Sequence, residues 1–467
     1  MIGLFILLHV YFVSFTDRPE KTAPQLSERA REQRARWHIP TDEMDYPVSG
    51  LYTDSLRRMG ATIYHKSRWF NGVTCEMNSK LAGKVAQLSF VKEVEMTRDN
   101  STPSGYQKRK NIPAERVKEA ASLLLTDPQL NLYNLKPLHQ AGFEGQGIVM
   151  AHFDGAFENA NTLSCYRQST LQLGALDFTD DSYDFYGSTG DHGEQCLSTI
   201  SGIKTNFHGA ATQAQYYLVR TEENDTESPK EMDNLVAGLE AADSLGVNVV
   251  SISLGYAEFD NSSWDLRYSD LDGRHTRASQ AATIAARKGI LVCVAAGNEG
   301  NAPWHYIGVP ADADSILTVG AVNTNRQIGS FSSYGPSADG RVKPDVCAVG
   351  VSTQLINPNG SNTTSNGTSY AAPLLAGLAA SLWSALPTEN AMQIRERILR
   401  SSDRYQTPDS THYGYGIPDA WTAYTMDLPM GTESIEGEKR CRKVLQNGQL
   451  LIERNGKKYT IGGLEIE

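Results

Sequence analysis

A chain of 467 residues is too long for one ordinary domain and predicts two or three. Its 40% hydrophobic and 21% charged residues are typical of a globular core and exclude an intrinsically disordered chain. The formal net charge of −11 argues against nucleic acid as a partner, because a surface that binds nucleic acid needs clustered Lys and Arg. Six cysteines are too few for a disulfide framework over this length.

The chain begins with an apolar run from Ile2 to Phe15. This run is shorter than the roughly 20 residues that span a bilayer as a helix, and its length suits the apolar part of a signal peptide. No Lys or Arg precedes the run and no clear cleavage site follows it, so an unprocessed N-terminus or a misplaced start codon is the alternative. We expect residues 1–20 to be a signal peptide and the protein to be exported.

A compact α+β pattern follows, and we assign it to a small domain of residues 43–98. The predicted helices are Tyr52–Met59 and Lys80–Leu88, and the predicted strands are Ala61–Tyr64, Trp69–Met77 and Phe90–Met96. Residues 99–126 are polar and contain the cluster Lys108-Arg109-Lys110. We interpret this stretch as an accessible linker where a maturation cut would fall, and the basic cluster as a solvated surface.

Residues 127–428 alternate short apolar runs with helical stretches, which predicts an α/β domain with a parallel sheet covered by helices on both faces. In such a sheet the active residues cluster at the carboxyl ends of the strands. The predicted strands are Ile148–Phe153, Gln215–Val219, Val247–Leu254, Ile290–Ala295 and Ile316–Val319. The predicted helices are Glu194–Ile203, Asp233–Leu245, Ser279–Lys288 and a run from Ala372 to Trp383.

Three residues of this region supply the parts of a nucleophilic triad. Asp154 ends a strand, His192 opens a helix, and Ser369 lies at a junction between a loop and a helix. A serine nucleophile needs an imidazole to take its proton and a carboxylate to orient that imidazole, and Asp, His, Ser is one chain order in which this triad recurs. Asn298, after another strand, can donate to an oxyanion together with the Ser369 N–H. Ser369 as a helix N-cap, with Pro373 just inside the helix, is the alternative.

Several motifs in order over residues 129–425 resemble the subtilisin-like (subtilase) serine peptidases. They are Asp154-Gly155, His192-Gly193, Ser253-Leu254-Gly255, Ala296-Gly297-Asn298, Val309-Pro310-Ala311, Phe331-Ser332-Ser333-Tyr334-Gly335-Pro336 and Gly367-Thr368-Ser369-Tyr370-Ala371-Ala372-Pro373. The resemblance implies a secreted endopeptidase with Ser369 as nucleophile, His192 as general base and acid, Asp154 as its partner and Asn298 as oxyanion donor.

The resemblance also implies polypeptide substrates that pair between two segments, Ser253-Leu254-Gly255 and Ala295-Ala296-Gly297. It implies that the small N-terminal domain is a propeptide, an intramolecular folding template and temporary inhibitor, although a permanent accessory domain is the alternative. The chain departs from the family where Asp154 and Gly155 adjoin, because a small hydroxyl residue usually lies between them. Asp191 is therefore the nearest rival of Asp154.

No cofactor is expected, because no His, Cys and Asp cluster has ligand spacing. A structural calcium, which is common in the family that the chain resembles, is the alternative, although the sequence has no recognisable loop for it. Cys196 lies four residues after His192, on the same side of a helix, and we expect it to be buried and unpaired. The rival functions are a peptide-binding pseudo-peptidase, which the presence of all four catalytic residue types disfavours, and a serine esterase, which the missing Gly-x-Ser-x-Gly elbow disfavours.

Residues 431–467 form a tail with Asn-Gly pairs at 447–448 and 455–456 between alternating residues, which predicts β-hairpins. The tail is similar to short β-rich segments of secreted proteins from some Gram-negative bacteria. That likeness suggests export machinery or cell-envelope attachment as partners, and a secreted or periplasmic bacterial protein. A hairpin extension packed on the catalytic domain is the alternative.

Overall fold

The computed structural model describes residues 7–20, 22–102, 112–113, 124–166, 171–179, 183–188 and 190–427, together with four strands of the tail. The chain divides into two compact units, residues 1–424 and residues 425–467. The first unit contains the N-terminal domain and the α/β domain, and the second unit is the tail.

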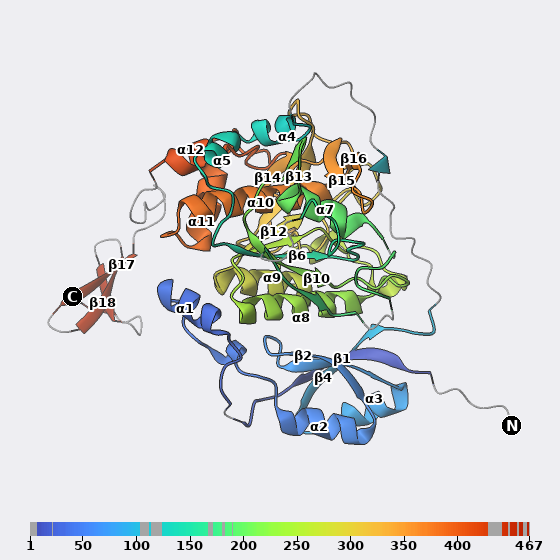
Figure 1. Ribbon diagram of the computed structural model, residues 1–467. Coiled ribbons are helices and arrows are strands. Elements are labelled where there is room, and N and C mark those ends of the chain that lie inside the picture. Colours follow the sequence, from blue (N-terminus) through green and yellow to red (C-terminus); the bar gives the residue numbers. More distant parts are fainter. Residues whose placement is uncertain are drawn as a thin grey trace. The chain divides into compact units, whose positions relative to one another are not determined.

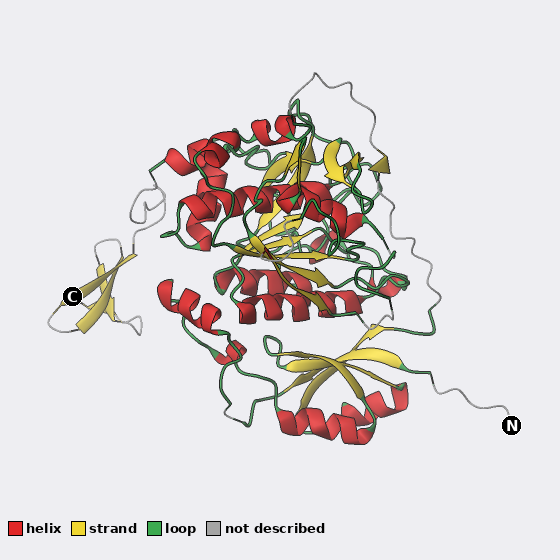
Figure 2. Ribbon diagram, in the orientation of Figure 1, coloured by secondary structure: helices red, strands yellow, loops and turns green. Residues whose placement is uncertain are grey.

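A parallel sheet is the centre of the α/β domain, as the alternation of strands and helices predicts (Figures 1 and 2). Its described strands number seven and follow the order β14-β13-β12-β11-β6-β10-β7, all parallel. They are β6 (Val149–Asp154), β7 (Gln172–Asp177), β10 (Gln215–Arg220), β11 (Val249–Ile252), β12 (Leu291–Ala295), β13 (Leu317–Val322) and β14 (Val346–Val349). The two edge strands, β7 and β14, are additional to the strands that the sequence predicts.

Helices cover both faces of this sheet, so its strands are buried on two sides (Figure 2). Along β6 the side chains alternate between two cores: Met150 packs in the core with α10, whereas Val149 and Ala151 pack in the core with α8 and α9. This alternation explains why the strands read as continuous apolar runs. The helices are α4 (Asp127–Leu132), α5 (Lys136–Gln140), α7 (His192–Ser201), α8 (Pro229–Leu245), α9 (Arg277–Arg287), α10 (Thr368–Ala385), α11 (Ala391–Arg400) and α12 (Ala420–Thr425).

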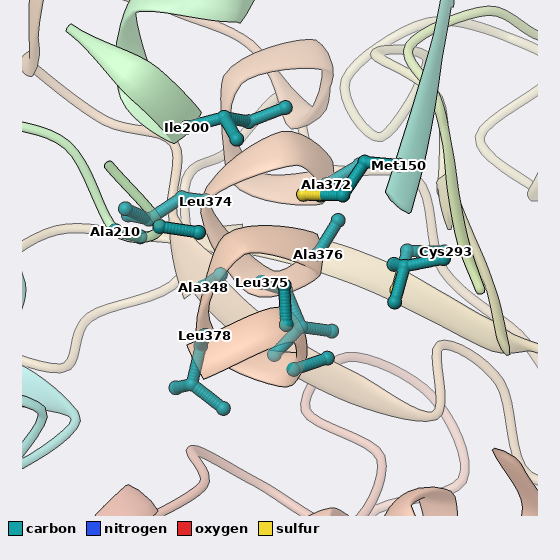
Figure 3. Packing of buried hydrophobic residues seen from close by; sticks show 14 of the residues in the cluster. Met150, Ile200, Ala210, Cys293, Ala348, Ala372, Leu374, Leu375, Ala376 and Leu378 are labelled. Carbon is teal, nitrogen blue, oxygen red and sulfur yellow. The ribbon is translucent and has the colours of Figure 1, made fainter. Parts of the chain in front are cut away.

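Helix α10 is buried on all sides from Thr368 to Trp383. Figure 3 shows the sheet residues Met150 and Cys293 on one side of the helix and Ala210 on another. A Cβ at Gly377 would lie 2.7 Å from the Cβ of Ala210, so a glycine is needed for this close approach. The helix that carries Ser369 is therefore held rigidly from every direction.

The N-terminal domain is a four-stranded antiparallel sheet in the order β2-β3-β1-β4 with two helices. Its elements are β1 (His9–Phe15), α2 (Gly50–Met59), β2 (Thr62–Ser67), β3 (Gly72–Met77), α3 (Ser79–Val85) and β4 (Val91–Arg98), while α1 (Glu28–Arg36) and a short 3-10 turn (Glu43–Asp45) lie between β1 and α2. The helices and the last three strands lie close to their predicted positions.

Strand β1 overturns two expectations. It comes from the apolar run at the chain start and pairs with both β3 and β4, with Val10 and Val13 fully buried. Removing residues 1–20 as a signal peptide would take away a central strand, so that assignment is wrong, and so is the domain boundary at residue 43. A short apolar run suits a buried strand as well as a signal peptide, and its pairing partners lie about 60 to 90 residues further along the chain.

The N-terminal domain binds helix α8 through the turn between β2 and β3. The carboxylate of Glu240 on α8 accepts hydrogen bonds from the backbone N–H of Arg68 at 2.8 Å and of Trp69 at 3.1 Å. The guanidinium of Arg68 pairs with Asp243, one turn further along α8. Trp69 is 4% exposed and packs into the core of the α/β domain. The contact is therefore extensively buried and its charges are paired.

Three short strands form a small sheet next to α10, in the order β15 (Thr353–Ile356), β16 (Asn362–Asn366) and β5 (Ile112–Pro113). A second small pair consists of β8 (Ile203–Lys204) and β9 (Phe207–His208). Strand β16 ends three residues before Ser369. Its pairing with β5 is antiparallel, with Ile112 opposite Asn366 and Pro113 opposite Ser365.

The tail is an antiparallel meander of β17 (Cys441–Gln446), β18 (Gln449–Arg454), β19 (Lys457–Thr460) and β20 (Glu465–Ile466). The first two pairings are hairpins whose connections contain the Asn-Gly pairs, which themselves lie outside the described residues. The predicted hairpins are thus present. Within the described part of the chain, no helix has the length and apolar character needed to cross a membrane.

Candidate active site

Asp154 and His192 meet at the carboxyl end of β6. The Nδ1 of His192 lies 2.8 Å from Oδ1 and 3.0 Å from Oδ2 of Asp154, which is 1% exposed. Gly193 allows this approach, because a Cβ there would lie 2.3 Å from the carbonyl oxygen of Ala156 and 2.8 Å from the Cβ of Asp154. The sequence therefore needs a glycine directly after the histidine.

The rival carboxylate has another partner. Oδ2 of Asp191 accepts a hydrogen bond from Nε2 of Gln195 at 2.7 Å. The backbone N–H of Gly155 instead donates to Oδ1 of Asp154 at 2.8 Å. The carboxylate that contacts His192 is that of Asp154, although no hydroxyl residue follows it.

Burial and charge act in opposite directions on this pair. Burial disfavours the charged imidazole, but the carboxylate of Asp154 and its hydrogen bond outweigh this effect and raise the pKa of His192 well above its usual value. For Asp154, burial disfavours the carboxylate, but the charge and the hydrogen bond of His192 lower its pKa overall. The pair therefore favours a carboxylate that orients an imidazole of increased basicity.

Ser369 lies in the first turn of α10 and is 7% exposed. Gly367 is the N-cap of this helix, so the alternative role of Ser369 as a capping residue is wrong. Pro373 has no N–H and cannot donate to the carbonyl of Ser369, as a residue four positions later in a helix normally does. That carbonyl instead accepts from Oγ of Ser253 at 2.8 Å and Sγ of Cys196 at 3.2 Å. The predicted substrate-binding residue Ser253 thus uses its side chain to hold the backbone of Ser369.

Cys196 lies beneath His192, as predicted, and it is fully buried and unpaired. Its sulfur lies 3.9 Å from Nδ1 and 4.0 Å from Nε2 of the imidazole. Burial raises the pKa of its thiol to about 11, so the thiol stays protonated near neutral pH. Its role in this geometry is packing and hydrogen bonding.

Asn298 follows β12 and faces the first turn of α10. Its Oδ1 accepts from the backbone N–H of Thr368 at 2.9 Å and from Oγ1 of Thr368 at 3.0 Å. The same hydroxyl accepts from the N–H of Gly297 at 3.1 Å. Because the amide oxygen is bound to Thr368, the amide nitrogen is left as a donor toward the groove. The N–H of Ser369 is a second donor, since first-turn amides have no partner within the helix.

One groove of about 1200 Å³ contains Asp154, His192, Asn298 and Ser369 in its lining. Of the predicted substrate-binding residues, the lining also includes Ser253, Leu254, Gly255, Ala295 and Gly297. Ala296 is not part of this lining: it is fully buried, and its N–H donates to the carbonyl of Val319 at 3.0 Å. Which side of a strand end faces the groove depends on the neighbouring strands, and the sequence of the segment alone does not give it.

Two features of the site are additional to the sequence predictions. His152 is fully buried on β6, with Nε2 3.7 Å from Oδ2 of Asp154, and burial lowers its pKa to about 4. A signal for this placement was available, because residues two apart on a strand share a face. The groove is also lined by Glu222, Glu227 and Glu258, which lie in the loops after β10 and β11 but outside the recognised motifs.

Among the described residues, two groups of side chains bring three possible metal ligands within 4.8 Å of one another. One group is His152, Asp154 and Cys196, and the other is Glu222, Glu227 and Glu231. Glu231 is engaged elsewhere, since its carboxylate accepts from the N–H of Glu223 at 2.8 Å and of Ser228 at 3.2 Å at the start of α8. The first group belongs to the triad region.

A parallel sheet that brings Asp154, His192 and Ser369 to one groove has the arrangement of the Asp-His-Ser serine hydrolases. The family model described as "Subtilase family" matches residues 163–416, and a model described as "Peptidase S8 propeptide domain, Bacteroidota" matches residues 10–114. The chain belongs to the subtilase family and is a subtilisin-like serine endopeptidase with an intramolecular propeptide. The propeptide match includes β1, in agreement with the fold.

Curated relatives cover the same region. Subtilisin DY of Bacillus licheniformis is 32% identical over 279 residues, which are 59% of this chain and 90% of the relative. Subtilisin NAT of Bacillus subtilis subsp. natto is 30% identical over 283 residues, 60% of this chain and 66% of the relative. A solved structure, "Crystal structure of MycP1 from the ESX-1 type VII secretion system", is similar with a TM-score of 0.54 at 21% identity, covering 70% of this chain and 93% of that chain. This last likeness supports the fold alone.

Proposed function

We propose that the chain hydrolyses peptide bonds with Ser369 as nucleophile, His192 as general base and then general acid, and Asp154 as the residue that orients His192. The observation that carries this proposal is the pair of contacts from Nδ1 of His192 to Asp154, in a groove that Ser369 also lines. These contacts leave Nε2 of His192 for the serine hydroxyl.

In this mechanism Oγ of Ser369 attacks the scissile carbonyl carbon while His192 takes its proton. The negative charge that develops on the carbonyl oxygen is stabilised by the amide nitrogen of Asn298 and the N–H of Ser369. His192 then protonates the leaving amine, and water hydrolyses the acyl-enzyme by the same steps in reverse order. The hydrogen bonds from Ser253 and Cys196 to the carbonyl of Ser369 keep the first turn of α10 in place during these steps.

A fluorophosphonate probe tests the nucleophile, because such probes form a covalent bond only with an activated serine. We expect the probe to label the matured protein, and the label to disappear in Ser369→Ala. A label that persists in this variant would place the nucleophile elsewhere.

Asn298→Ala tests the oxyanion donor. We expect kcat to fall about a hundredfold to a thousandfold with a small change in KM, because this donor acts mainly in the transition state; the magnitude is the one known for the oxyanion-hole Asn of subtilisin, a relative of this chain. The measurement is steady-state hydrolysis of a peptide substrate by both forms. If the loss falls chiefly on KM, Asn298 binds substrate in the ground state instead.

The propeptide is expected to inhibit the matured enzyme when it is added as a separate chain of residues 7–102. A segment of residues 43–98 should not inhibit, because it lacks β1, on which β3 and β4 both pair. The measurement is titration of peptide hydrolysis with each segment.

Two variants of the longer segment make this test specific. Arg68→Ala leaves Asp243 buried without this partner and should weaken inhibition at least tenfold. Arg57→Ala is the control, since Arg57 is about half exposed and pairs only with Asp54 inside the propeptide. Full inhibition by residues 43–98 would contradict the role of β1.

We also propose that the protein is bacterial and acts outside the cytoplasm, on polypeptides. The support is the description of the propeptide model, which names Bacteroidota, and the bacterial origin of the curated relatives. A role of the tail in export or envelope attachment remains our proposal from its sequence. Fractionation of cells that produce the protein with and without residues 431–467 tests both proposals.

A further inference from the structure

Two imidazoles, a carboxylate and a thiol meet on the inner side of the triad. His152 and Asp154 are two residues apart on β6 and share a face of that strand, and Nε2 of His152 lies 3.7 Å from Oδ2 of Asp154. His192 and Cys196 are four residues apart on α7 and share a side of that helix, with Sγ of Cys196 3.9 Å from Nδ1 of His192. The two pairs join where Oδ2 of Asp154 lies 3.0 Å from Nδ1 of His192.

The triad does not itself require His152. Its ring is fully buried and lies edge-on to Phe157, with 5.8 Å between the ring centroids. Within the described part of the chain, neither of its nitrogens has a hydrogen-bond partner of ordinary geometry, although the backbone carbonyls of Gly193 and Ser251 lie near the ring. A buried polar group in this state costs free energy unless a water molecule or an ion completes its bonds. Nε2 faces Asp154, so an ion bound there would also contact the carboxylate.

The spacing of these atoms suits a tetrahedral zinc ion. Zinc binds imidazole nitrogen, carboxylate oxygen and thiolate sulfur at about 2.0 to 2.3 Å, so two ligand atoms of a tetrahedral site lie about 3.3 to 3.8 Å apart. The ligand atoms of His152, Asp154 and Cys196 all lie within 4.8 Å of one another. Shifts of about 1 Å or less would bring these three atoms to the spacing of a zinc site. Nδ1 of His192 adjoins two of them and is placed to be the fourth ligand.

We propose that these four side chains form an inhibitory site for Zn²⁺: His152, Asp154, His192 and Cys196. This inference rests on the proposed function, because the metal acts on the residues of the triad. It takes the place of the proton on Nδ1 of His192 and binds the carboxylate that orients the ring. The ring proton then resides on Nε2, which can no longer accept the proton of Ser369. The fold stays intact while the nucleophile is inactive.

Binding moves protons and changes no oxidation state. The thiol of Cys196 releases its proton to solvent as the sulfur–zinc bond forms, because only the thiolate is a ligand. The proton of His192 passes from Nδ1 to Nε2, so the imidazole stays neutral, and Asp154 exchanges its contact with Nδ1 for a bond to the metal. The carbonyl of Ser369 loses the thiol as a donor but keeps the hydroxyl of Ser253 at 2.8 Å. One proton is therefore released for each metal ion bound.

The metal enters from the groove. His192 lines the groove with a side chain that is 31% exposed, whereas the other three ligands are buried on its inner side. A rotation of the imidazole opens the way to them. A site with nitrogen and sulfur ligands selects Zn²⁺ and Cd²⁺ over Ca²⁺ and Mg²⁺, which prefer oxygen ligands.

The first test is inhibition of peptide hydrolysis by the metal ion alone. The matured enzyme is freed of transition metals on a chelating resin and titrated with Zn²⁺. We expect Zn²⁺ to inhibit and a chelator to restore activity, whereas Ca²⁺ and Mg²⁺ at the same concentration leave activity unchanged. His152→Leu and Cys196→Val should each raise the inhibition constant of Zn²⁺ at least about tenfold, since even the loss of an outer-shell group lowers metal affinity by that much.

His208→Gln is the matched control for these variants. It removes an imidazole from a separate group, in which the rings of His139 and His208 lie 5.4 Å apart and Nε2 of His208 lies 3.2 Å from Oε2 of Glu144. The inhibition constant of Zn²⁺ should be the same in this variant as in the unmodified enzyme.

A second measurement detects the site without using activity. Cd²⁺ stands in for Zn²⁺ and gives an ultraviolet charge-transfer band when it binds a thiolate, which is a soft ligand. Every chain carries Cys441→Ser, so that the thiol of the tail does not contribute. We expect one equivalent of Cd²⁺ to produce the band and Cys196→Val to lose it. Cys293→Ala, which removes another buried thiol, is the control and should keep the band.

The outcomes separate this inference from the proposed function. Absence of the Cd²⁺ band, absence of inhibition by Zn²⁺, or equal inhibition of the unmodified enzyme and a folded His152→Leu would overturn the inference while hydrolysis itself stands. Loss of inhibition in His208→Gln would place the inhibitory metal elsewhere and would also overturn it. A folded, metal-free chain that hydrolyses no peptide would overturn the proposed function, and the Cd²⁺ band would still decide whether the four side chains bind a metal. The band is measured with the site's own residues, so it does not depend on the folding of a site variant.

Discussion

Ser369→Ala is expected to abolish peptide hydrolysis and to leave the fold intact. The other two hydroxyls that the first turn of α10 contributes to the groove lining are engaged: Oγ1 of Thr368 donates to Oδ1 of Asn298 at 3.0 Å, and the hydroxyl of Tyr370 donates to Oε1 of Gln195 at 3.1 Å. A loss of about a millionfold in kcat is expected, the size known for the nucleophile of subtilisin, a relative of this chain. The fold is retained because the change removes one oxygen atom, while the carbonyl of Ser369, which Ser253 and Cys196 bind, stays in place.

The measurement is hydrolysis of a chromogenic peptide by both forms, with circular dichroism to compare their folding. Ser384→Ala is a matched control: it lies on the same helix, and its hydroxyl donates to the carbonyl of Ser381 at 2.7 Å, remote from the groove lining. Hydrolysis by a folded Ser369→Ala at the rate of the unmodified chain would refute the assignment of the nucleophile.

The α/β domain could be predicted from the sequence, because the apolar runs and helical stretches that form it are local patterns. Strand β6 is an apolar run that ends in Asp154, and β12 is one that ends two residues before Gly297. Parallel strands bring their carboxyl ends to one edge, so residues far apart in the sequence could be expected at one site. The positions of Asp154, His192, Asn298 and Ser369 in one groove follow from this rule.

The remaining features depend on partners that are distant in the sequence. The run that forms β1 becomes a strand because β3 and β4 pair with it, and its own composition does not distinguish that state from a signal peptide. The role of Ser253 depends on Pro373, which lies on another element, helix α10. Because Pro373 has no N–H, the carbonyl of Ser369 has no donor within the helix and accepts from Ser253 instead. The acidic character of the groove arises from loops after different strands, which only the folded chain brings together.

Asp154→Asn is expected to lower kcat by about 10⁴-fold, the size known for the corresponding change in a serine protease triad. In the proposed mechanism the carboxylate, which lies 2.8 Å from Nδ1 of His192, holds the proton on Nδ1 and stabilises the imidazolium that forms when Ser369 is deprotonated. An amide at this position can hold the ring with its oxygen or its nitrogen, and it carries no charge. The fold should remain, because Asn and Asp have nearly the same shape.

The same variant has a distinct pH profile, which separates loss of this charge from a general defect. His192 must be neutral to act as a base, and Asp154 raises its pKa, so activity of the unmodified enzyme falls as pH drops through that raised value. Without the carboxylate the pKa of His192 falls, so the acid limb of the kcat/KM profile should move to lower pH. The ratio of unmodified to variant activity should therefore shrink as the solution becomes more acidic. Asp191→Asn serves as the comparison, since Asp191 contacts Gln195 and should leave the acid limb in place. A profile of Asp154→Asn that is lower at every pH but parallel to that of the unmodified enzyme would mean that Asp154 does not set the basicity of His192.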